Sequence, residues 1–165
     1  MKRFDFNTAD LIDASPDARS CEVQFRQFGR RRVFGGKIRT LKCEGDSASV
    51  KKLLNTLSDG EVLVADGGGL LSCALLGDMA ASAGAANGWA GAVVYGAVRD
   101  VEAIHETDFG IKALGCNPRK ITPQGTGEID VPLHFGGVDF IPGHYLYSDA
   151  DGIVVSEGPL LPGQE

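Results

Sequence analysis

The chain has 165 residues, of which 23 are glycine, and its formal net charge is −6. The glycines follow no fixed period, which excludes a collagen-like chain, and an apolar content of 43% is too high for a disordered chain. The acidic balance argues against nucleic acid as the main partner, because phosphate binding needs clustered Lys and Arg. At this length we expect a single domain spanning residues 1–165.

The beginning of the sequence and its cysteines bear on the cellular compartment. MKRFDFNTAD has two basic residues without an apolar run behind them, so we expect no signal peptide. Residues 79–98 carry no charge, but Ala, Gly, Ser and Asn dilute them, so we expect an interior helix, a turn and a strand rather than a membrane span. No cysteine belongs to a C-x-x-C pair, which favours reduced, largely buried thiols and a cytoplasmic protein. The cysteines are Cys21, Cys43, Cys73 and Cys116.

Residues 1–44 predict a surface segment followed by two strands. Thr8 or Asp10 is expected to cap a short helix. Apolar and polar residues alternate over residues 22–44, and Gly35-Gly36 interrupts the alternation, so we expect two strands joined by a turn at these glycines. The arginines at positions 30–32 form a basic cluster, and such a run typically belongs to a solvated face.

The rest of the chain predicts short helices alternating with short strands, and therefore a mixed α and β fold. Asp46 and Ser47 are expected to open a helix that ends near residues 59–60. An Ala-rich helix is expected from residue 77 to about 87, and a helical turn over residues 101–105. The expected strands are 61–66, 72–76, 90–95 and 111–116. The expected loops are 67–69, 96–100 and 118–128, and short strands and turns follow them.

Two motifs give weak indications of chemistry. VLVADGGGL superficially resembles the nucleotide or S-adenosylmethionine loop of Rossmann-like enzymes, but that loop needs G-x-G spacing and a helix directly behind it. A tight glycine turn between strands is therefore favoured over a methyltransferase site. His105 lies beside Glu106 and Asp108, which could form a small acidic metal site, although a solvated polar turn is favoured. His134 and His144 make no metal-spaced pair.

A stronger candidate site lies at the two ends of the charge-free stretch. Asp78 precedes it and Arg99-Asp100 follows it, with 20 uncharged residues between them. A helix followed by a strand takes the chain out and back, so these ends can meet around free backbone N–H groups near residues 77–80. Such N–H groups and the helix dipole suit a carboxylate, Asp100 suits a divalent cation, and Arg99 suits a keto-acid oxygen. The alternative is an N-cap at Asp78 and a surface pair at Arg99-Asp100.

Three segments resemble one known family. GGGLLSCALLGDMA, GWAGAVVYGAVRDVEAI and GTGEIDVPLHFGGVDFIPGHYLYSDADGIVV resemble the regulators of ribonuclease E activity A, and equally the class II 4-hydroxy-4-methyl-2-oxoglutarate aldolases that share their fold. The resemblance covers about residues 10–160. It implies an α/β fold, namely a single-domain β/β/α sandwich of the swivelling-domain type that assembles as a homotrimer.

The resemblance also implies roles for individual residues. The aldolase branch has the pattern D-x20-R-D, which is present here as Asp78, Arg99 and Asp100. By resemblance, Asp100 binds the divalent metal, Mg2+ or Mn2+, and Arg99 binds the pyruvyl oxygens of the substrate and is catalytic. Asp78 orients a water molecule or shares in proton transfer.

By the same resemblance, the backbone around Asp78 receives the carboxylate of the substrate. The other residues of this segment are Gly77, Met79 and Ala80. Met79 stands where many relatives have Asn, which affects side-chain contacts at this position but not backbone contacts.

The activity that the resemblance implies is that of a metal-dependent class II aldolase acting on a small 2-oxo acid. It would cleave 4-hydroxy-4-methyl-2-oxoglutarate or 4-carboxy-4-hydroxy-2-oxoadipate to give pyruvate, and would decarboxylate oxaloacetate through the same pyruvate enolate. The alternative is a non-catalytic regulator that binds and inhibits ribonuclease E, in which the acidic surface pairs with an Arg-rich segment of that partner.

Overall fold

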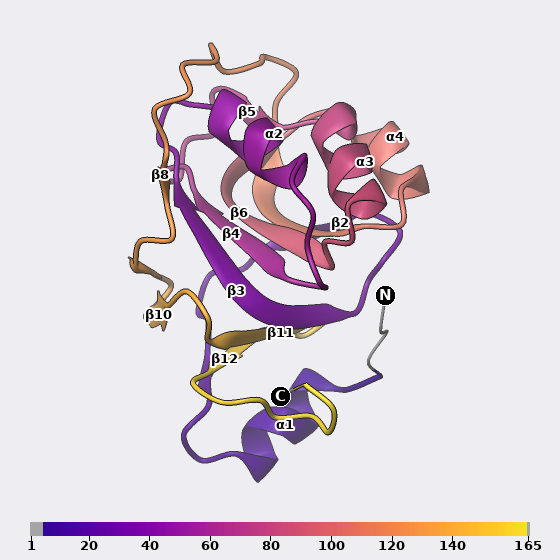
Figure 1. Ribbon diagram of the computed structural model, residues 1–165, viewed down its shortest axis with the longest axis vertical. Coiled ribbons are helices and arrows are strands. Elements are labelled where there is room, and N and C mark those ends of the chain that lie inside the picture. The colour runs from indigo at the N-terminus through magenta and orange to yellow at the C-terminus, as the bar shows by residue number, and fades with distance from the viewer. Residues whose placement is uncertain (1–4, 165) are drawn as a thin grey trace.

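A curled sheet with helices on one face forms the centre of the protein, and the structure, a computed structural model, describes residues 5–164 (Figure 1). The helices are α1 (Thr8–Ala14), α2 (Ala48–Leu54), α3 (Asp78–Ala86) and α4 (Val101–Glu106). The strands are β1 (Arg19–Ser20), β2 (Arg26–Phe28), β3 (Phe34–Lys42), β4 (Val62–Asp66), β5 (Ala74–Leu76), β6 (Gly91–Val98), β7 (Gly110–Cys116), β8 (Glu128–Ile129), β9 (Leu133–Phe135), β10 (Val138–Phe140), β11 (Tyr145–Asp149) and β12 (Gly152–Ser156).

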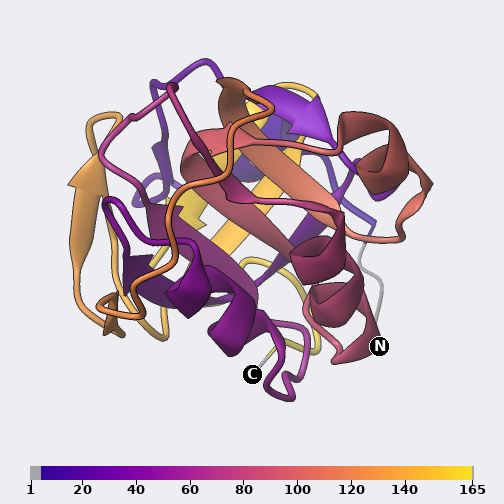
Figure 2. The same cartoon turned by 90° about the horizontal axis from the view of Figure 1, so that it is seen from above.

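The strands run across the main sheet in the order β1-β12-β11-β3-β4-β6-β7-β2, with β5 beside β6 and β8 beside β3. The four strands β3, β4, β6 and β7 pair in parallel, and α2, α3 and α4 form the successive crossovers between them. Because such crossovers share one handedness, all three helices cover the same face of the sheet, as both views show (Figures 1 and 2).

The central strands are buried on both faces, which explains their continuous apolar sequences. In β4, Leu63 and Ala65 belong to the core under the helices, whereas Val62 and Val64 belong to the core on the opposite face. Trp89 fills the helix-side core and donates its indole N–H to the carbonyl of Thr56 at 2.9 Å.

The opposite face of the sheet is covered by the β9–β10 hairpin, and α1 packs on the outer side of β11 and β12. The hairpin of β9 and β10 contributes Leu133, Phe135 and Phe140 to the second core. Beyond it, Leu11 and Ile12 lie in a third apolar cluster with the outer side chains of β11 and β12, and Figure 1 shows α1 beneath these strands. The mixed α/β sandwich expected from the sequence is confirmed.

The turn predicted at Gly35-Gly36 is wrong, because both glycines lie inside β3. A Cβ atom on Gly36 would stand 2.0 Å from the carbonyl oxygen of Gly60, and one on Gly35 would stand 2.8 Å from that of Leu146. These glycines let other backbone segments approach the strand closely. The chain turns instead over residues 29–33, where Gly29 has a φ of +84°.

Arg31 also departs from the expectation of a solvated arginine face. Its side chain is only 9% exposed, and its guanidinium donates to the carbonyls of Ala90 and Asp108 and forms an ion pair with the Asp108 carboxylate. This arginine fixes the turn before β3 to the segment that precedes β7.

Smaller corrections concern the ends of elements. The N-cap of α1 is Asn7, whose Oδ1 accepts from the N–H groups of Ala9 and Asp10, whereas the backbone and hydroxyl of Thr8 donate to the carboxylate of Asp149. Helix α2 ends at Leu54, well before residues 59–60. Strand β6 continues through residues 96–98, which were expected to be a loop.

The charge-free stretch folds as expected into a helix, α3, and a strand, β6. Among residues 5–164, no helix is both long enough and apolar enough to cross a membrane. The four cysteines are free thiols, but Cys43 alone is fully buried and Cys116 is exposed. Burial and the nearby carboxylates of Asp66 and Asp46 raise the pKa of the Cys43 thiol to about 12.

The close approach at Gly36 gives a testable consequence. We predict that Gly36→Ala lowers the free energy of unfolding by about 1–3 kcal/mol, because the methyl group would force β3 away from Gly60. Urea denaturation measures the change. Gly158→Ala, at an exposed position with open space around its Cβ, is the matched control and should change stability by less than about 0.5 kcal/mol. Equal effects of the two substitutions would contradict this account.

Candidate functional site

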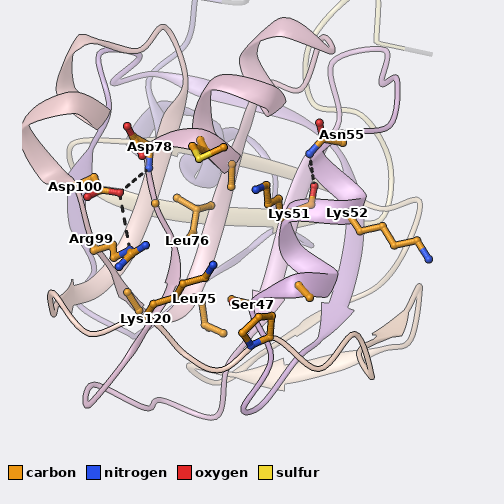
Figure 3. A pocket seen from close by; sticks show the side chains of 16 residues that line it. Ser47, Lys51, Lys52, Asn55, Leu75, Leu76, Asp78, Arg99, Asp100 and Lys120 are labelled. Carbon is orange, nitrogen blue, oxygen red and sulfur yellow. Dashed lines mark hydrogen bonds and ion pairs between the residues drawn. The ribbon is translucent and has the colours of Figure 1, made fainter.

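A cavity of about 410 Å3 lies at the carboxyl ends of β5 and β6 (Figure 3). Its walls come from α2, from β5 and the start of α3, from the residues that follow β6, and from the loop after β7. In open α/β sheets, ligands bind outside the carboxyl ends of the strands, where loops and helix N-termini converge. The position of the cavity therefore marks it as the candidate functional site.

The pairing of β5 with β6 brings the two ends of the charge-free stretch together, as the sequence led us to expect. The backbone N–H of Arg99 donates to the carbonyl of Leu76 at 3.0 Å. The backbone N–H of Asp78 donates to Oδ2 of Asp100 at 3.2 Å, and Nε of Arg99 lies 3.9 Å from the same oxygen. Asp78, Arg99 and Asp100 thus form one cluster at the cavity wall (Figure 3).

Asp100 has an unusual backbone conformation that aims its carboxylate at α3. Its φ of 60° and ψ of 42° lie in the left-handed region, which Asp tolerates better than most residues other than glycine. The adjacent Gly77 leaves room for the carboxylate, because a Cβ there would lie 2.7 Å from Oδ2 of Asp100. Non-glycine residues in this conformation concentrate at functional sites.

The N-terminus of α3 is only partly occupied by this carboxylate. Asp100 accepts the N–H of Asp78, and the N–H of Ala81 bonds to the carbonyl of Gly77. Within residues 5–164, the backbone N–H groups of Met79 and Ala80 have no hydrogen-bond acceptor. These donors and the helix dipole can receive one more anionic group from the cavity.

The alternative interpretation of these residues holds only in part. Gly77, not Asp78, occupies the N-cap position of α3. Arg99 and Asp100 do form a pair, with side chains 36% and 39% exposed, so both remain accessible to a ligand. Arg99 also donates from Nη1 to the carbonyl of Pro118 at 3.5 Å, which ties the arginine to the loop after β7.

The carboxylates at the cavity suit a weakly ligated divalent cation. Among residues 5–164, no group of three or more His, Cys, Asp or Glu side chains gathers as a metal site, and the carboxylates that line the cavity are Asp78 and Asp100. Mg2+ commonly binds through one or two carboxylates and keeps several water molecules. Oδ1 of Asp100 has no hydrogen-bond partner in the same part of the chain, so this donor set fits such an ion.

Three lysines of the cavity wall were not identified from the sequence. Lys51 and Lys52 come from α2, and Lys120 comes from the loop after β7. No spacing motif relates these positions to Asp78 or Arg99. Only the folding of α2 and the loop around the end of β5 brings them to one cavity.

Asp46, which was expected only to open a helix, fixes two walls of the cavity. Its buried carboxylate accepts hydrogen bonds from the N–H of Ala48 and the hydroxyl of Ser49 at the start of α2. It also accepts four consecutive backbone N–H groups of the loop after β7, those of residues 124–127. Burial acts to raise the pKa of Asp46, but these hydrogen bonds outweigh burial and hold the pKa well below its usual range.

The weaker sequence candidates do not form sites. The glycine turn has positive φ at Gly68 and Gly69, as expected, but it leads toward β5 and not directly into a helix. His105 stacks on Phe28 with ring centroids 6.0 Å apart. His134 bonds to the carboxylate of Asp139 at 2.7 Å on the exposed β9–β10 hairpin.

The sequence matches the RraA-like family, Aldolase/RraA, over residues 8–155. One similar structure comes from Geobacillus kaustophilus HTA426 and is described as S-adenosylmethionine: 2-dimethylmenaquinone methyltransferase. It is 40% identical in sequence, and the match includes 97% of this chain and 100% of the Geobacillus chain, with a TM-score of 0.93. The RNA-processing inhibitor RraA from Thermus thermophilis is 41% identical, with coverage of 98% and 99% and a TM-score of 0.92. Streptomyces coelicolor RraAS2, described as an unusual member of the RNase ES inhibitor RraA protein family, is 28% identical, with coverage of 84% and 72% and a TM-score of 0.69.

From the hydrogen bonds to the ionised Asp46 carboxylate, we predict that the stability of the folded chain falls in acid. Asp46→Asn should lower the free energy of unfolding by about 2–3 kcal/mol at pH 7, because an amide cannot accept from all six donors. Since the folded pKa is lowered, the stabilisation is fully present above the pKa of an unfolded aspartate, about 4, and is lost as pH falls through the folded value.

Urea denaturation between pH 7 and pH 3 measures this effect, with Asp59→Asn at an exposed aspartate as the control. The difference between wild type and Asp46→Asn should shrink at the acidic end. A difference that stays constant with pH would contradict the assignment.

Proposed function

The chain belongs to the RraA-like family (Aldolase/RraA), and from this premise we propose that it is a divalent-metal-dependent lyase that releases pyruvate from a small 2-oxo acid. The proposed substrates are 4-hydroxy-4-methyl-2-oxoglutarate or 4-carboxy-4-hydroxy-2-oxoadipate, with decarboxylation of oxaloacetate as a side activity. The observation that carries the proposal is the convergence of Arg99, Asp100 and the N-terminus of α3 on one cavity.

Substrate binding is assigned to groups that remain available in the cavity. The backbone N–H groups of Met79 and Ala80 receive the carboxylate next to the 2-oxo group, since they point from a helix N-terminus. The Arg99 guanidinium binds the 2-oxo oxygen, where its planar donors match adjacent oxygens. Together these contacts hold the bond to be broken in a fixed orientation.

Asp100 is proposed to hold Mg2+ or Mn2+ through its available oxygen, with water completing the coordination. When bound, this cation supplies Lewis-acid polarisation of the 2-oxo group. The Arg99 guanidinium lies beside this carboxylate, with its Nε 3.9 Å from Oδ2 of Asp100.

Cleavage requires removal of a proton from the C4 hydroxyl and stabilisation of the electrons left on C3. Asp78, in the first turn of α3, is assigned to proton transfer through a water molecule that it orients. When the C3–C4 bond breaks, the C4 oxygen becomes the carbonyl oxygen of a second 2-oxo acid, which leaves. The electron pair of the bond passes into a pyruvate enolate, and Arg99 stabilises its developing negative charge. Protonation at C3 gives pyruvate. Oxaloacetate loses CO2 to give the same enolate.

Assembly as a homotrimer is part of the proposal. Met79, at the cavity wall, and Leu71, in the segment before β5, are large apolar side chains that are exposed on a single chain. Their exposure supports a neighbouring copy of the chain packing beside the cavity. A methyltransferase function, as in the description of the Geobacillus protein, is not proposed, because the glycine turn lacks the helix that a nucleotide loop needs.

A second candidate function is inhibition of ribonuclease E by binding, without catalysis. It is favoured by the likeness to the RNA-processing inhibitor RraA from Thermus thermophilis. The net charge of −6 would pair with a basic segment of such a partner. The two functions do not exclude each other.

The lyase proposal predicts that Asp100→Asn and Arg99→Gln each lower kcat/KM for pyruvate release by about 100- to 1000-fold. Pyruvate is measured from 4-hydroxy-4-methyl-2-oxoglutarate and from oxaloacetate with Mg2+, with the rate of the metal alone subtracted, and a chelator should abolish the wild-type activity. Asp59→Asn, at an exposed position, is the control that should keep full activity. Full activity of Asp100→Asn with added Mg2+ would overturn the metal assignment.

The regulator proposal predicts direct binding to ribonuclease E and slower RNA cleavage in its presence. Because the attraction would be electrostatic, binding should weaken as salt rises from about 50 to 300 mM. Titration of purified ribonuclease E with the wild type and with Arg99→Gln separates the two functions, since a non-catalytic inhibitor does not need this arginine. No binding at low salt would eliminate the second candidate.

A further inference from the structure

Lys112 is a buried lysine that the proposed lyase chemistry does not use. It lies in β7, and its side chain faces the second core, to which its strand partner Val93 belongs. The residue is 3% exposed, and Nζ donates to the carbonyl of Asp149 at 2.6 Å. Among residues 5–164 this is the one hydrogen bond of the ammonium group, which forms no ion pair there. Lysine is almost never buried unless it is paired, so the remaining N–H donors need another acceptor.

The charge of Lys112 is costly to bury. Burial penalises the charged form and lowers the pKa of the amine, whereas the negative charge of Asp149 raises it, Arg32 lowers it and Asp151 raises it. The Asp149 carboxylate itself bonds to the N–H and the hydroxyl of Thr8 in α1, so the ammonium group contacts only the carbonyl of this residue. A polar acceptor beside the ammonium group would reduce the cost of burying it.

Two oxygen atoms that could take part in such a contact are buried close to Lys112. Oγ of Ser148 and Oε1 of Gln27 have no hydrogen-bond partner in the described part of the chain. Gln27 is the cross-strand partner of Lys112 in the antiparallel pair of β2 and β7, so the two side chains lie side by side on one face. The amide nitrogen of Gln27 is already used, because it donates to the carbonyls of Phe28 and Arg31.

Ser148 approaches Lys112 from β11. The residue that follows it is Asp149, whose carbonyl accepts the hydrogen bond from Lys112. Ser148 faces the second core, since its strand partners Phe34 and Ile153 both belong to that core. A serine between two large apolar side chains leaves space for a small polar ligand beside the ammonium group.

A water molecule matches these three groups. Its oxygen accepts one N–H of the Lys112 ammonium group, and its two hydrogens are donated to Oε1 of Gln27 and Oγ of Ser148. Buried water molecules typically make about three hydrogen bonds to polar groups that the protein leaves unsatisfied. A chloride ion fits less well, because the amide oxygen of Gln27 is an acceptor and would repel an anion.

We propose that Lys112, Ser148 and Gln27 form an internal binding site for one water molecule, which links β2 and β7 to β11 across the second core. The water solvates the buried ammonium group and satisfies both oxygens. None of the three residues lines the cavity at Arg99, so the site is separate from the proposed lyase chemistry and does not depend on it.

A crystal structure of the wild type, at a resolution that shows ordered water, tests the site directly. We expect one peak of density about 2.7–3.2 Å from Nζ of Lys112, Oγ of Ser148 and Oε1 of Gln27. The absence of this peak would overturn the proposal. An anomalous peak at the same place in crystals soaked in bromide would also overturn it, because the ligand would then be an anion.

Urea denaturation tests the same site in solution. Ser148→Ala should lower the urea midpoint of the wild type by about 0.3–1 M, because the water loses one of its three partners. In the Lys112→Met background, the same substitution should leave the midpoint unchanged or raise it. The reason is that the ammonium group that binds the water is gone, so the Ser148 hydroxyl is already unsatisfied.

Ser20→Ala is the matched control, because Ser20 is an exposed serine of a strand, β1. It should change the urea midpoint by the same small amount in the wild-type and Lys112→Met backgrounds. Equal effects of Ser148→Ala in the two backgrounds would contradict the proposed site. If Lys112→Met does not fold, the density in the wild-type crystal decides the question alone.

Discussion

The hydrogen bond from the N–H of Arg99 to the carbonyl of Leu76 joins the end of β6 to the end of β5 and sets the rest of the site. It places Arg99 and Asp100 beside the first turn of α3, where the Asp100 carboxylate accepts the N–H of Asp78. Three charged residues that flank a 20-residue uncharged stretch thereby meet at one point. If this pairing shifted, the Arg99 side chain and the N-terminus of α3 would move apart. They could then no longer bind the same anion.

The side chains that line the cavity are mostly basic, although the whole chain carries a net negative charge. An acidic protein repels small anions at long range, so any cavity that is to bind a small anion has to gather its own positive charge. Lys51, Lys120, Arg99 and the N-terminus of α3 provide that charge from four separate segments. Asp46 holds two of these segments together with a buried carboxylate, so a buried negative charge organises the positive wall.

Prediction from the sequence succeeded where neighbouring residues decide the structure and failed where distant ones do. The Ala-rich helix and the apolar strand after it follow from local pattern, and so does the meeting of their ends. Gly35 and Gly36 gave the local signal of a turn, yet they lie in a strand because Gly60 and Leu146 pack against them. Arg31 belonged to a basic run, yet its side chain is only 9% exposed, because Ala90 and Asp108 accept its hydrogen bonds.

The sequence by itself determined the class of fold, the order of most elements and the three charged residues Asp78, Arg99 and Asp100, because each depends on patterns within about 25 residues. Only the tertiary structure decided that the Asp100 carboxylate would accept the N–H of Asp78 at the start of α3 and that Lys51 and Lys120 would line the same cavity as Arg99. The physical reason is that these contacts depend on the pairing of β5 with β6 and on the loop bound by Asp46. The pairing joins strands with one helix between them, so local pattern predicts that their ends meet but not where the Asp100 carboxylate points. Asp46 and residues 124–127 lie 78 to 81 residues apart, where local pattern carries no information.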